Sequence, residues 1–300
     1  MELRQLRYFV AVAEERHFGR AAHRLQIATP TLSQQLRALE RDLRVVLVDR
    51  SRPGSVSLTP AGNVLLRHAR ILLARADRAR DEVLAAHGHP EQLTLRVASG
   101  VEHVLRDQLS DLTSRTTGLD VITISSVSSD AVQAVRDETA DAAIVWNVTG
   151  RDRGLAAALL RQVPVDLALP ASHRLAGAAS VNVADLAEET IVLFPRALSS
   201  AVWDRFHHHL LPRGPTRPDQ VYIEPDSINA PVAVLRTVAA GRGLAPAIRA
   251  AAQHAAVDGI VLRALDPPLT LPLTLIWREP ASPSLRQLLA LLTPDSKPTP

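Results

Sequence analysis

The chain has no cysteine, one methionine and one lysine among its 300 residues. Without cysteine there is no disulfide, no thiolate nucleophile and no cysteine-based zinc site, and a reducing compartment is compatible with the sequence. No segment approaches the ~20 consecutive apolar residues of a membrane span, and the first apolar run, 8–13, is too short for a signal peptide. We therefore expect a cytoplasmic protein without membrane contact.

The amino-acid composition is typical of a globular protein. Hydrophobic residues make up 46% and charged residues 22%, and the length allows two or three domains. Positive charge is concentrated at the N-terminal end: residues 1–62 hold ten arginines and six acidic residues, a net +4, and residues 63–90 hold five and three, a net +2. Such an excess is expected where a chain meets a polyanion, although +4 over sixty residues is also ordinary.

The segment 27–43, IATPTLSQQLRALERDL, predicts a helix from Pro30 to Leu43. Its leucines recur at steps of four, three and four and form one apolar stripe, with Thr29 expected to cap the helix and Pro30 to suit its first turn. The opposite face carries amides and guanidinium groups, which can pair bidentately with bases in the major groove of DNA. The candidate DNA contacts on this helix are Thr29, Thr31, Ser33, Gln34, Arg37 and Arg41, of which Gln34 and Arg37 are the predicted base readers.

The neighbouring segments complete a small unit over residues 1–60. Amphipathic stretches at 3–13 and 18–25 predict two further helices, and β-prone pieces on both sides of Pro53–Gly54 predict a hairpin, or wing. Helix, helix–turn–helix and wing are the parts of a winged DNA-binding domain. Further candidate DNA contacts on the second helix and the wing are Arg20, Arg24, Arg50 and Arg52. Solvated arginines, or an ion pair at Arg50, are the alternatives.

Residues 61–90 predict a linker helix. Small or apolar residues recur in steps of four and three, which is a heptad pattern that favours dimerisation: Leu65, Ala69, Leu72, Ala76, Ala79, Val83 and Ala86. The alternative is a helix packed on its own protein. We expect a homodimer or a homotetramer.

Residues 91–300 alternate between strand-like and helical runs, which predicts an α/β fold with mainly parallel sheets. The expected strands are 93–99, 120–125, 142–146, 165–169, 190–194, 220–224, 259–263 and 273–277, with helices that include 102–115 and 129–138. Proline-containing segments at 161–165 and 266–272 predict two crossings between lobes. Lobe I would hold 91–163 plus 267–300, lobe II would hold 164–266, and a ligand would bind in the cleft between them.

Polar turns after these strands are the candidate effector contacts. Hydroxyls and free N–H groups there suit a polar acceptor, although simple helix capping explains them equally well. The candidates are Ser99, Gly100, Val101, Ser126, Ser128, Ser129, Trp146, Phe194, Arg196, Asp226 and Ser227. Arg196 would clamp an acidic ligand or be an ordinary surface residue, and Trp146 would be a ring wall of the site or pack in the core. Few aromatic residues (3%) and many serines favour a small acidic or polar effector.

The sequence offers little support for catalysis. The three histidines at 207–209 point about 100° apart on a helix and cannot all reach one ion. The glycines at 241–243 lack the phosphate-binding spacing, and no serine lies in a nucleophile-elbow motif. We predict no metal, no cofactor and no enzymatic activity.

Residues 6–43 (LRYFVAVAEERHFGRAAHRLQIATPTLSQQLRALERDL), followed by LVDR (47–50) and LTPAG (58–62), resemble the LysR-type transcriptional regulators. The resemblance continues through 173–196 and 238–246. It implies a winged helix-turn-helix, a long linker helix that dimerises, and a two-lobed periplasmic-binding-protein-like effector domain. The implied function is effector-controlled binding to double-stranded DNA, with RNA polymerase as a further candidate partner. The alternative is a ligand-independent or architectural DNA-binding protein.

Two segments depart from the family pattern. Ala28–Thr29 stands where the family usually has Ser-Gln before the proline, so the operator sequence does not carry over. The glycine segment at 241–246, GRGLAP, is shorter than usual, which alters the contacts expected from that loop.

Overall fold

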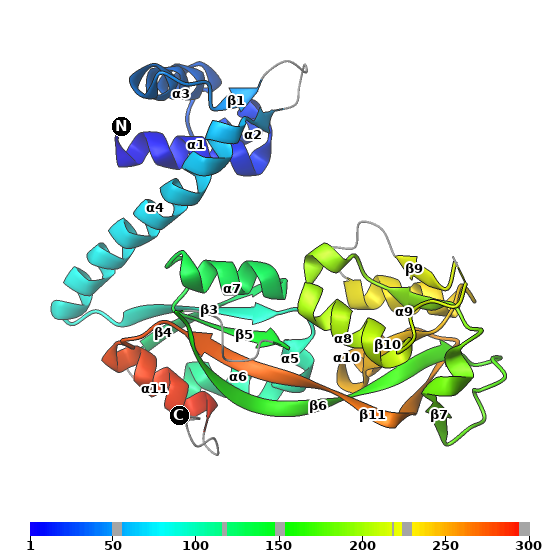
Figure 1. The fold of residues 1–300 in the computed structure, drawn as a ribbon. Helices are drawn as coiled ribbons and strands as arrows, with labels where there is room; N and C mark the ends of the chain where they lie inside the picture. Colours follow the sequence, from blue (N-terminus) through cyan, green and yellow to red (C-terminus); the bar gives the residue numbers. More distant parts are fainter. Residues whose placement is uncertain (50–55, 116–118, 148–153, 218, 224–229, 294–300) are drawn as a thin grey trace. The chain divides into compact units, whose positions relative to one another are not determined.

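The computed structural model describes residues 1–49, 56–115, 119–147, 154–217, 219–223 and 230–293 (Figure 1). The chain divides into two compact units. One holds residues 1–91 with 137–139, and the other holds residues 92–136 and 140–300. No helix among the described residues is long and apolar enough to cross a membrane.

The first unit is helical, as the sequence predicts. Its elements are α1 (Leu3–Glu15), α2 (Phe18–Arg24), α3 (Thr29–Leu43), β1 (Val48–Asp49), β2 (Ser57–Leu58) and α4 (Pro60–Ala86). The apolar stripes meet in one core, where Phe9, Leu32, Leu36 and Leu39 are buried. β1 and β2 pair antiparallel, as expected of a wing, whose turn lies outside the described residues.

The start of α3 differs from the prediction. Thr29 is not the cap, because the helix begins at Thr29 itself and Ala28 is the N-cap residue, with no side-chain hydrogen bond. A capping residue needs extended backbone geometry, which Ala28 has and a helical residue lacks. Pro30 does occupy the first turn, as predicted.

The LTPAG segment joins the wing to α4 through Thr59 and Gly62. The amide N of Thr59 donates to the Leu47 carbonyl (3.0 Å), its hydroxyl donates to the Val46 carbonyl (2.7 Å), and that hydroxyl accepts from the amide N of Gly62 (3.0 Å). A Cβ on Gly62 would clash with the Leu47 carbonyl oxygen. Only glycine therefore fits this position.

The second unit is built on a large sheet. Its elements in chain order are β3 (Glu91–Ala98), α5 (Val101–Val104), α6 (Arg106–Arg115), β4 (Leu119–Ser126), α7 (Ser128–Arg136), β5 (Ala142–Trp146), β6 (Ala156–Pro170), β7 (Ser180–Asn182), η1 (Val183–Leu186), β8 (Ile191–Leu193), η2 (Arg196–Leu198), α8 (Ser200–Leu210), β9 (Val221–Ile223), α9 (Ala230–Ala239), β10 (Ala245–Ile248), α10 (Arg249–Ala255), β11 (Ile260–Trp277) and α11 (Pro283–Leu292). The strand order is β10-β6-β11-β5-β3-β4, with β7 also paired to β11 and with β8 and β9 in a separate small sheet.

The prediction of mainly parallel sheets is wrong for the large sheet. Its pairs β10–β6, β6–β11 and β11–β5 are antiparallel, whereas β3–β5 and β7–β11 are parallel. The physical reason is that the chain leaves along β6 and returns along β11, so these two long neighbours run in opposite directions. The predicted strands 259–263 and 273–277 are the two ends of β11.

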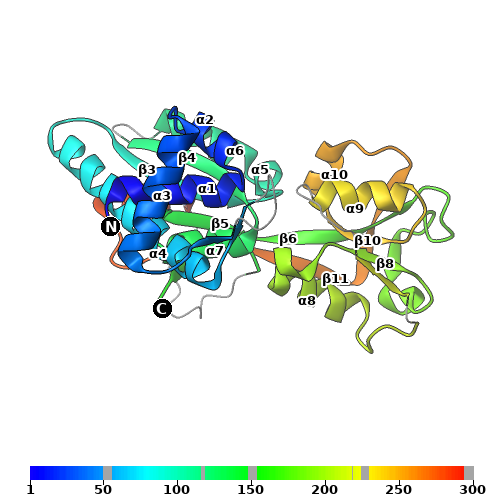
Figure 2. The ribbon, with the colours of Figure 1, turned by 90° about the horizontal axis from the view of Figure 1, so that it is seen from above.

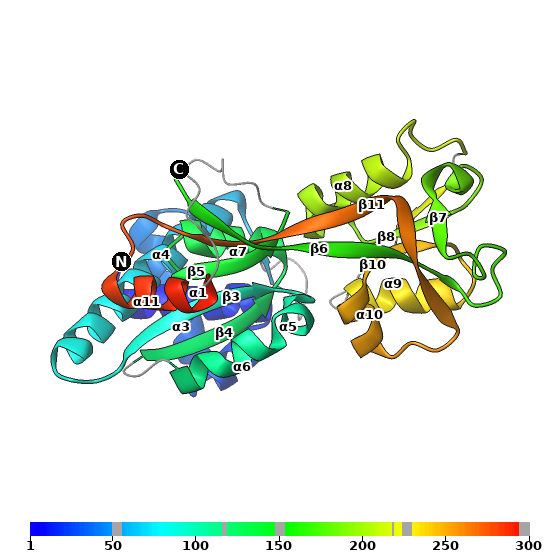
Figure 3. The ribbon, with the colours of Figure 1, turned by 90° about the horizontal axis from the view of Figure 1, so that it is seen from below.

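Figures 2 and 3 show β6 and β11 running side by side between two groups of elements. We call the group with β3, β4, β5, α5, α6, α7 and α11 lobe I, and the group with β7–β10 and α8–α10 lobe II. The predicted proline-containing crossings lie within β6 and β11. The β11 register shifts between Ala264 and Leu269, a local irregularity that tolerates prolines lacking an N–H.

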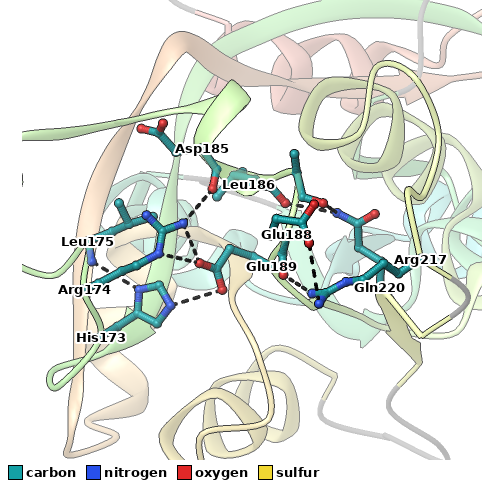
Figure 4. Close-up of polar contacts among 10 residues, drawn as sticks. His173, Arg174, Leu175, Asp185, Leu186, Glu188, Glu189, Arg217 and Gln220 are labelled. Atoms are coloured by element: carbon teal, nitrogen blue, oxygen red, sulfur yellow. Dashed lines mark hydrogen bonds and ion pairs between the residues drawn. The ribbon is translucent and has the colours of Figure 1, made fainter.

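Polar contacts link three segments of lobe II (Figure 4). The fully buried Gln220 donates from its side-chain nitrogen to the Leu186 carbonyl (3.0 Å). Glu189 accepts from Arg174 Nε (3.0 Å), and its other oxygen lies 3.2 Å from His173 Nε2. These bonds fix the loop after β6 and the segment before β9 onto η1.

Candidate DNA-reading helix and effector cavity

The polar face of α3 is free of the unit's own packing. Leu32, Leu36 and Leu39 are buried, whereas Gln34 and Arg37 on the other side are exposed. Of the other predicted contacts, Thr29, Thr31 and Arg41 are exposed and Ser33 is half-buried. The helix thus presents amide and guanidinium groups outward from a fixed apolar back.

The arginines of α2 are held by acids of α1. Arg24 Nη1 lies 2.9 Å from a Glu14 carboxylate oxygen and 3.4 Å from one of Glu15, and the hydrogen bond with Glu14 raises the pKa of Arg24. Arg20 donates to the Glu15 carbonyl and lies 3.6 Å from its carboxylate. These pairs are exposed and compete with phosphate for both guanidinium groups. The other two predicted contacts, Arg50 and Arg52, fall outside the described residues.

The heptad positions of α4 divide into two sets. Ala69 is fully buried in the core of the first unit and Leu65 packs against that core. By contrast, 41% of Leu72 and 71% of Val83 are exposed. The N-terminal half of α4 therefore packs on its own protein, which the sequence left as an alternative, and the C-terminal half remains uncovered within this chain.

A cavity of about 130 Å³ lies in the second unit, with walls from both lobes. Its walls are mainly apolar, and no charged side chain is among the described residues that form them. The residues that line it are Ser99, Gly100, Val127, Ser128, Trp146, Phe194, Leu198, Ser199, Val202, Phe206, Pro231, Val234, Leu235, Pro246, Ala247, Ile248, Ala251, Ala252 and Leu271.

Five of the predicted effector contacts line this cavity: Ser99, Gly100, Ser128, Trp146 and Phe194. The indole of Trp146 is fixed in place, since Nε1 donates to the Ser99 carbonyl at 3.0 Å. The Trp146 amide donates to the Ser128 hydroxyl at 3.4 Å. The turns after β3 and β4 are thus tied to the end of β5.

Four predicted contacts lie elsewhere. Val101 is buried in the core, Ser126 does not line the cavity, and the exposed Ser129 donates to the Leu198 carbonyl at 3.3 Å. Arg196 forms two hydrogen bonds of 2.7 Å with Asp204, which raise the pKa of Arg196 and lower that of Asp204. The last two predicted contacts, Asp226 and Ser227, fall outside the described residues.

Most of the apolar wall was not predicted. Val202 and Phe206 of α8, Val234 and Leu235 of α9, and Leu271 of β11 all line the cavity. Their helical or alternating spacing is that of ordinary core residues, so a single sequence holds no signal that separates them from the core. The apolar walls also differ from the expectation of a site for an acidic ligand.

Family models match both units. The model described as bacterial regulatory helix-turn-helix protein, lysR family, matches residues 3–63, and the LysR substrate binding domain matches residues 86–296. The chain belongs to the LysR family. It is a LysR-type DNA-binding transcriptional regulator with an effector-binding domain, as the resemblance implied.

Relatives match two thirds or more of the chain. The transcriptional regulator IlvR of Caulobacter vibrioides is 32% identical over 299 residues, or 98% of each chain. ShiR of Corynebacterium glutamicum is 36% identical over 203 residues, which cover 67% of this chain and 68% of ShiR. These relatives are named as transcriptional regulators, not as enzymes.

Solved structures show the same fold. The crystal structure of CbnR, a LysR family transcriptional regulator, is 24% identical, covers 99% of this chain and 100% of CbnR, and has a TM-score of 0.75. CbnR complexed with its target DNA matches with a TM-score of 0.71. The predicted fold class, with a helical winged unit, a long helix and an α/β effector domain, is confirmed.

Proposed function

We propose that α3 reads base edges of an operator through Gln34 and Arg37, and that a small molecule in the cavity of the second unit controls this binding. The observation that carries the proposal is the exposure of both side chains opposite a buried leucine stripe. An amide pairs bidentately with adenine and a guanidinium with guanine, at about 1–3 kcal/mol of discrimination each. Thr29, Thr31 and Ser33 would contact the backbone and fix the register.

The same proposal covers the organisation of the chain. The DNA-binding domain would span residues 1–60, the linker helix 61–90 and the effector domain 91–300, and the protein would act as a cytoplasmic homo-oligomer without catalytic activity. Support comes from the uncovered C-terminal half of α4 and from the DNA complex of CbnR, a protein of the same fold. The cavity disfavours a purely architectural protein, which needs no ligand site.

Effector control requires a difference in affinity. A ligand shifts the protein between two DNA-binding arrangements only if it binds one of them more tightly. Footprints on the chain's own upstream DNA, recorded with and without a metabolite panel, are therefore expected to change in extent or bend with one compound. A footprint that ignores every compound would favour the architectural alternative.

The base-reading residues are tested by substitution. Gln34→Ala and Arg37→Ala should each weaken the best site by about 1–3 kcal/mol and relax base preference at one position of a randomised operator library. Arg41→Ala, further along the exposed face, is the matched control and should weaken all sequences alike, with a shallower salt dependence. A uniform loss over all sequences for Gln34→Ala and Arg37→Ala would show that neither residue reads bases.

A further inference from the structure

The size of the cavity limits its ligand. About 130 Å³ is close to the ~150 Å³ of an apolar cavity that accommodates one benzene molecule, and it is well below the ~300–1,000 Å³ of pockets for drug-sized compounds. A single six-membered ring or a branched chain of similar volume fits. A fused bicyclic compound or a nucleotide exceeds this volume.

The walls determine the polarity of that ligand. Trp146, Phe194 and Phe206 supply ring surfaces, and Val202 and Val234 supply aliphatic surface. Transferring an ionised carboxylate from water into such surroundings without a cationic partner carries a large free-energy penalty. An apolar body gains free energy in the same place, roughly in proportion to the area it buries.

Two arginines close in sequence to wall residues have partners of their own. Arg196 is engaged by both oxygens of Asp204, and Arg249, which follows the wall residue Ile248, lies 2.8 Å from the buried Asp166. Neither arginine lines the cavity. Neither Arg196 nor Arg249 can therefore give an acidic ligand a counter-charge without leaving its own ion pair.

Two wall hydroxyls offer complementary hydrogen bonding. The Ser128 oxygen accepts from the Trp146 amide, so the Ser128 proton can be donated to a ligand oxygen. The Ser99 hydroxyl donates to the Ser126 carbonyl at 3.3 Å, so its oxygen can accept. One donor beside one acceptor matches a hydroxyl group, or a carbonyl that uses the donor alone.

We infer that the cavity takes one compact, uncharged and mainly apolar molecule, a single ring or a branched chain of similar size, that carries one hydroxyl or carbonyl group. This inference rests on the proposed function for its regulatory meaning, but the binding itself needs no DNA. Of the acidic or polar effector expected from the sequence, it disfavours the acidic alternative.

Calorimetric titration of the full chain without DNA tests the inference with four probes: phenol, benzyl alcohol, benzoate and 1-naphthol. Phenol and benzyl alcohol should bind and raise the Tm by mass action. Benzoate, similar in size to benzyl alcohol but charged, should bind at least about tenfold more weakly, and the bicyclic 1-naphthol should not bind. Benzoate binding more tightly than benzyl alcohol, or naphthol binding more tightly than phenol, would overturn the inference.

A cavity-filling variant independently tests whether phenol binds in this cavity. Val202→Phe adds a ring to the wall and should weaken phenol binding at least about tenfold, with an unchanged circular dichroism spectrum. Val261→Phe, a half-buried position of β11 that does not line the cavity, is the matched control and should leave phenol affinity unchanged. Equal phenol affinity in Val202→Phe and the native chain would place the ligand elsewhere.

Footprints run on the same protein separate the two proposals. Binding of phenol without any specific footprint would contradict the proposed operator binding and leave the cavity assignment standing. A specific footprint on a protein that binds benzoate and rejects phenol would contradict only the ligand class.

Discussion

At the scale of single residues, backbone geometry explains why some positions admit one amino acid only. Gly62 lies against the Leu47 carbonyl, where the first residues of α4 meet the wing. A methyl group there would force the wing away from the helix. The hydrogen bonds of Thr59 that cap this junction would then be lost as well.

We predict that Gly62→Ala destabilises the first unit by about 2–4 kcal/mol, since overpacking and the loss of a cap act together. Urea unfolding, followed by a probe in the first unit, measures the change. Gly177→Ala is the matched control, because a Cβ at the exposed Gly177 meets nothing within 4 Å, and it should change stability by less than about 0.5 kcal/mol. Equal stability of the two variants would mean that the junction relaxes freely.

The exposure of single side chains can be predicted from the sequence where helical periodicity determines it. The exposure of Gln34 and Arg37 followed from the leucine spacing, because helical periodicity fixes both faces at once. The ion pair between Arg196 and Asp204 was not predicted. It joins residues eight positions apart, across the junction between η2 and α8, where no periodic pattern relates the two side chains.

At the scale of elements, α4 illustrates how a heptad pattern can serve two purposes. Its first positions pack on α1 and its last positions are exposed within this chain. Sequence periodicity alone does not distinguish the first heptad positions from the last, because it indicates which side of the helix is apolar and not which partner covers that side. The same limit explains why β11 was predicted as two strands, with prolines between them.

We predict that Val83→Asp weakens self-association, because it places a carboxylate at an apolar heptad position in the uncovered C-terminal half of α4. Sedimentation velocity should show the oligomer dissociating at a concentration at least about tenfold higher than for the native chain. His68→Asp adds the same charge to α4 at an exposed position outside the heptad and should leave the oligomer intact. An unchanged oligomer in Val83→Asp would show that another surface holds the subunits together.

At the scale of the second unit, the two lobes touch across a pair of histidines. His103 of α5 in lobe I stacks on His254 of α10 in lobe II, with ring centroids 4.1 Å apart. Arg106 Nη2 lies 3.0 Å from His254 Nδ1, and because a guanidinium only donates, this ring nitrogen is the acceptor. Glu102 lies 3.6 Å from His103 Nε2.

Lowering the pH should weaken this contact between the lobes. Burial, reinforced by His254 and Arg106 and opposed by Glu102, lowers the pKa of His103. A histidine with a depressed pKa in the closed form stabilises that form above its ordinary pKa of about 6.5, and the stabilisation is lost as the pH falls below that value. A protonated His103 would also be repelled by the nearby Arg106 guanidinium.

We predict that the distance between the lobes increases when the pH is lowered from about 8 to about 5.5. Because the chain has no cysteine, Thr123→Cys on lobe I and Ala239→Cys on lobe II would be the sole sites for spin labels, and both positions are exposed. His103→Gln, which cannot gain a proton, should hold one distance over this range, whereas His208→Gln on the exposed face of α8 should open like the native chain. A native-chain distance that does not change with pH, or a distance that still changes in His103→Gln, would contradict this prediction. The stacked histidines would then have a purely structural role.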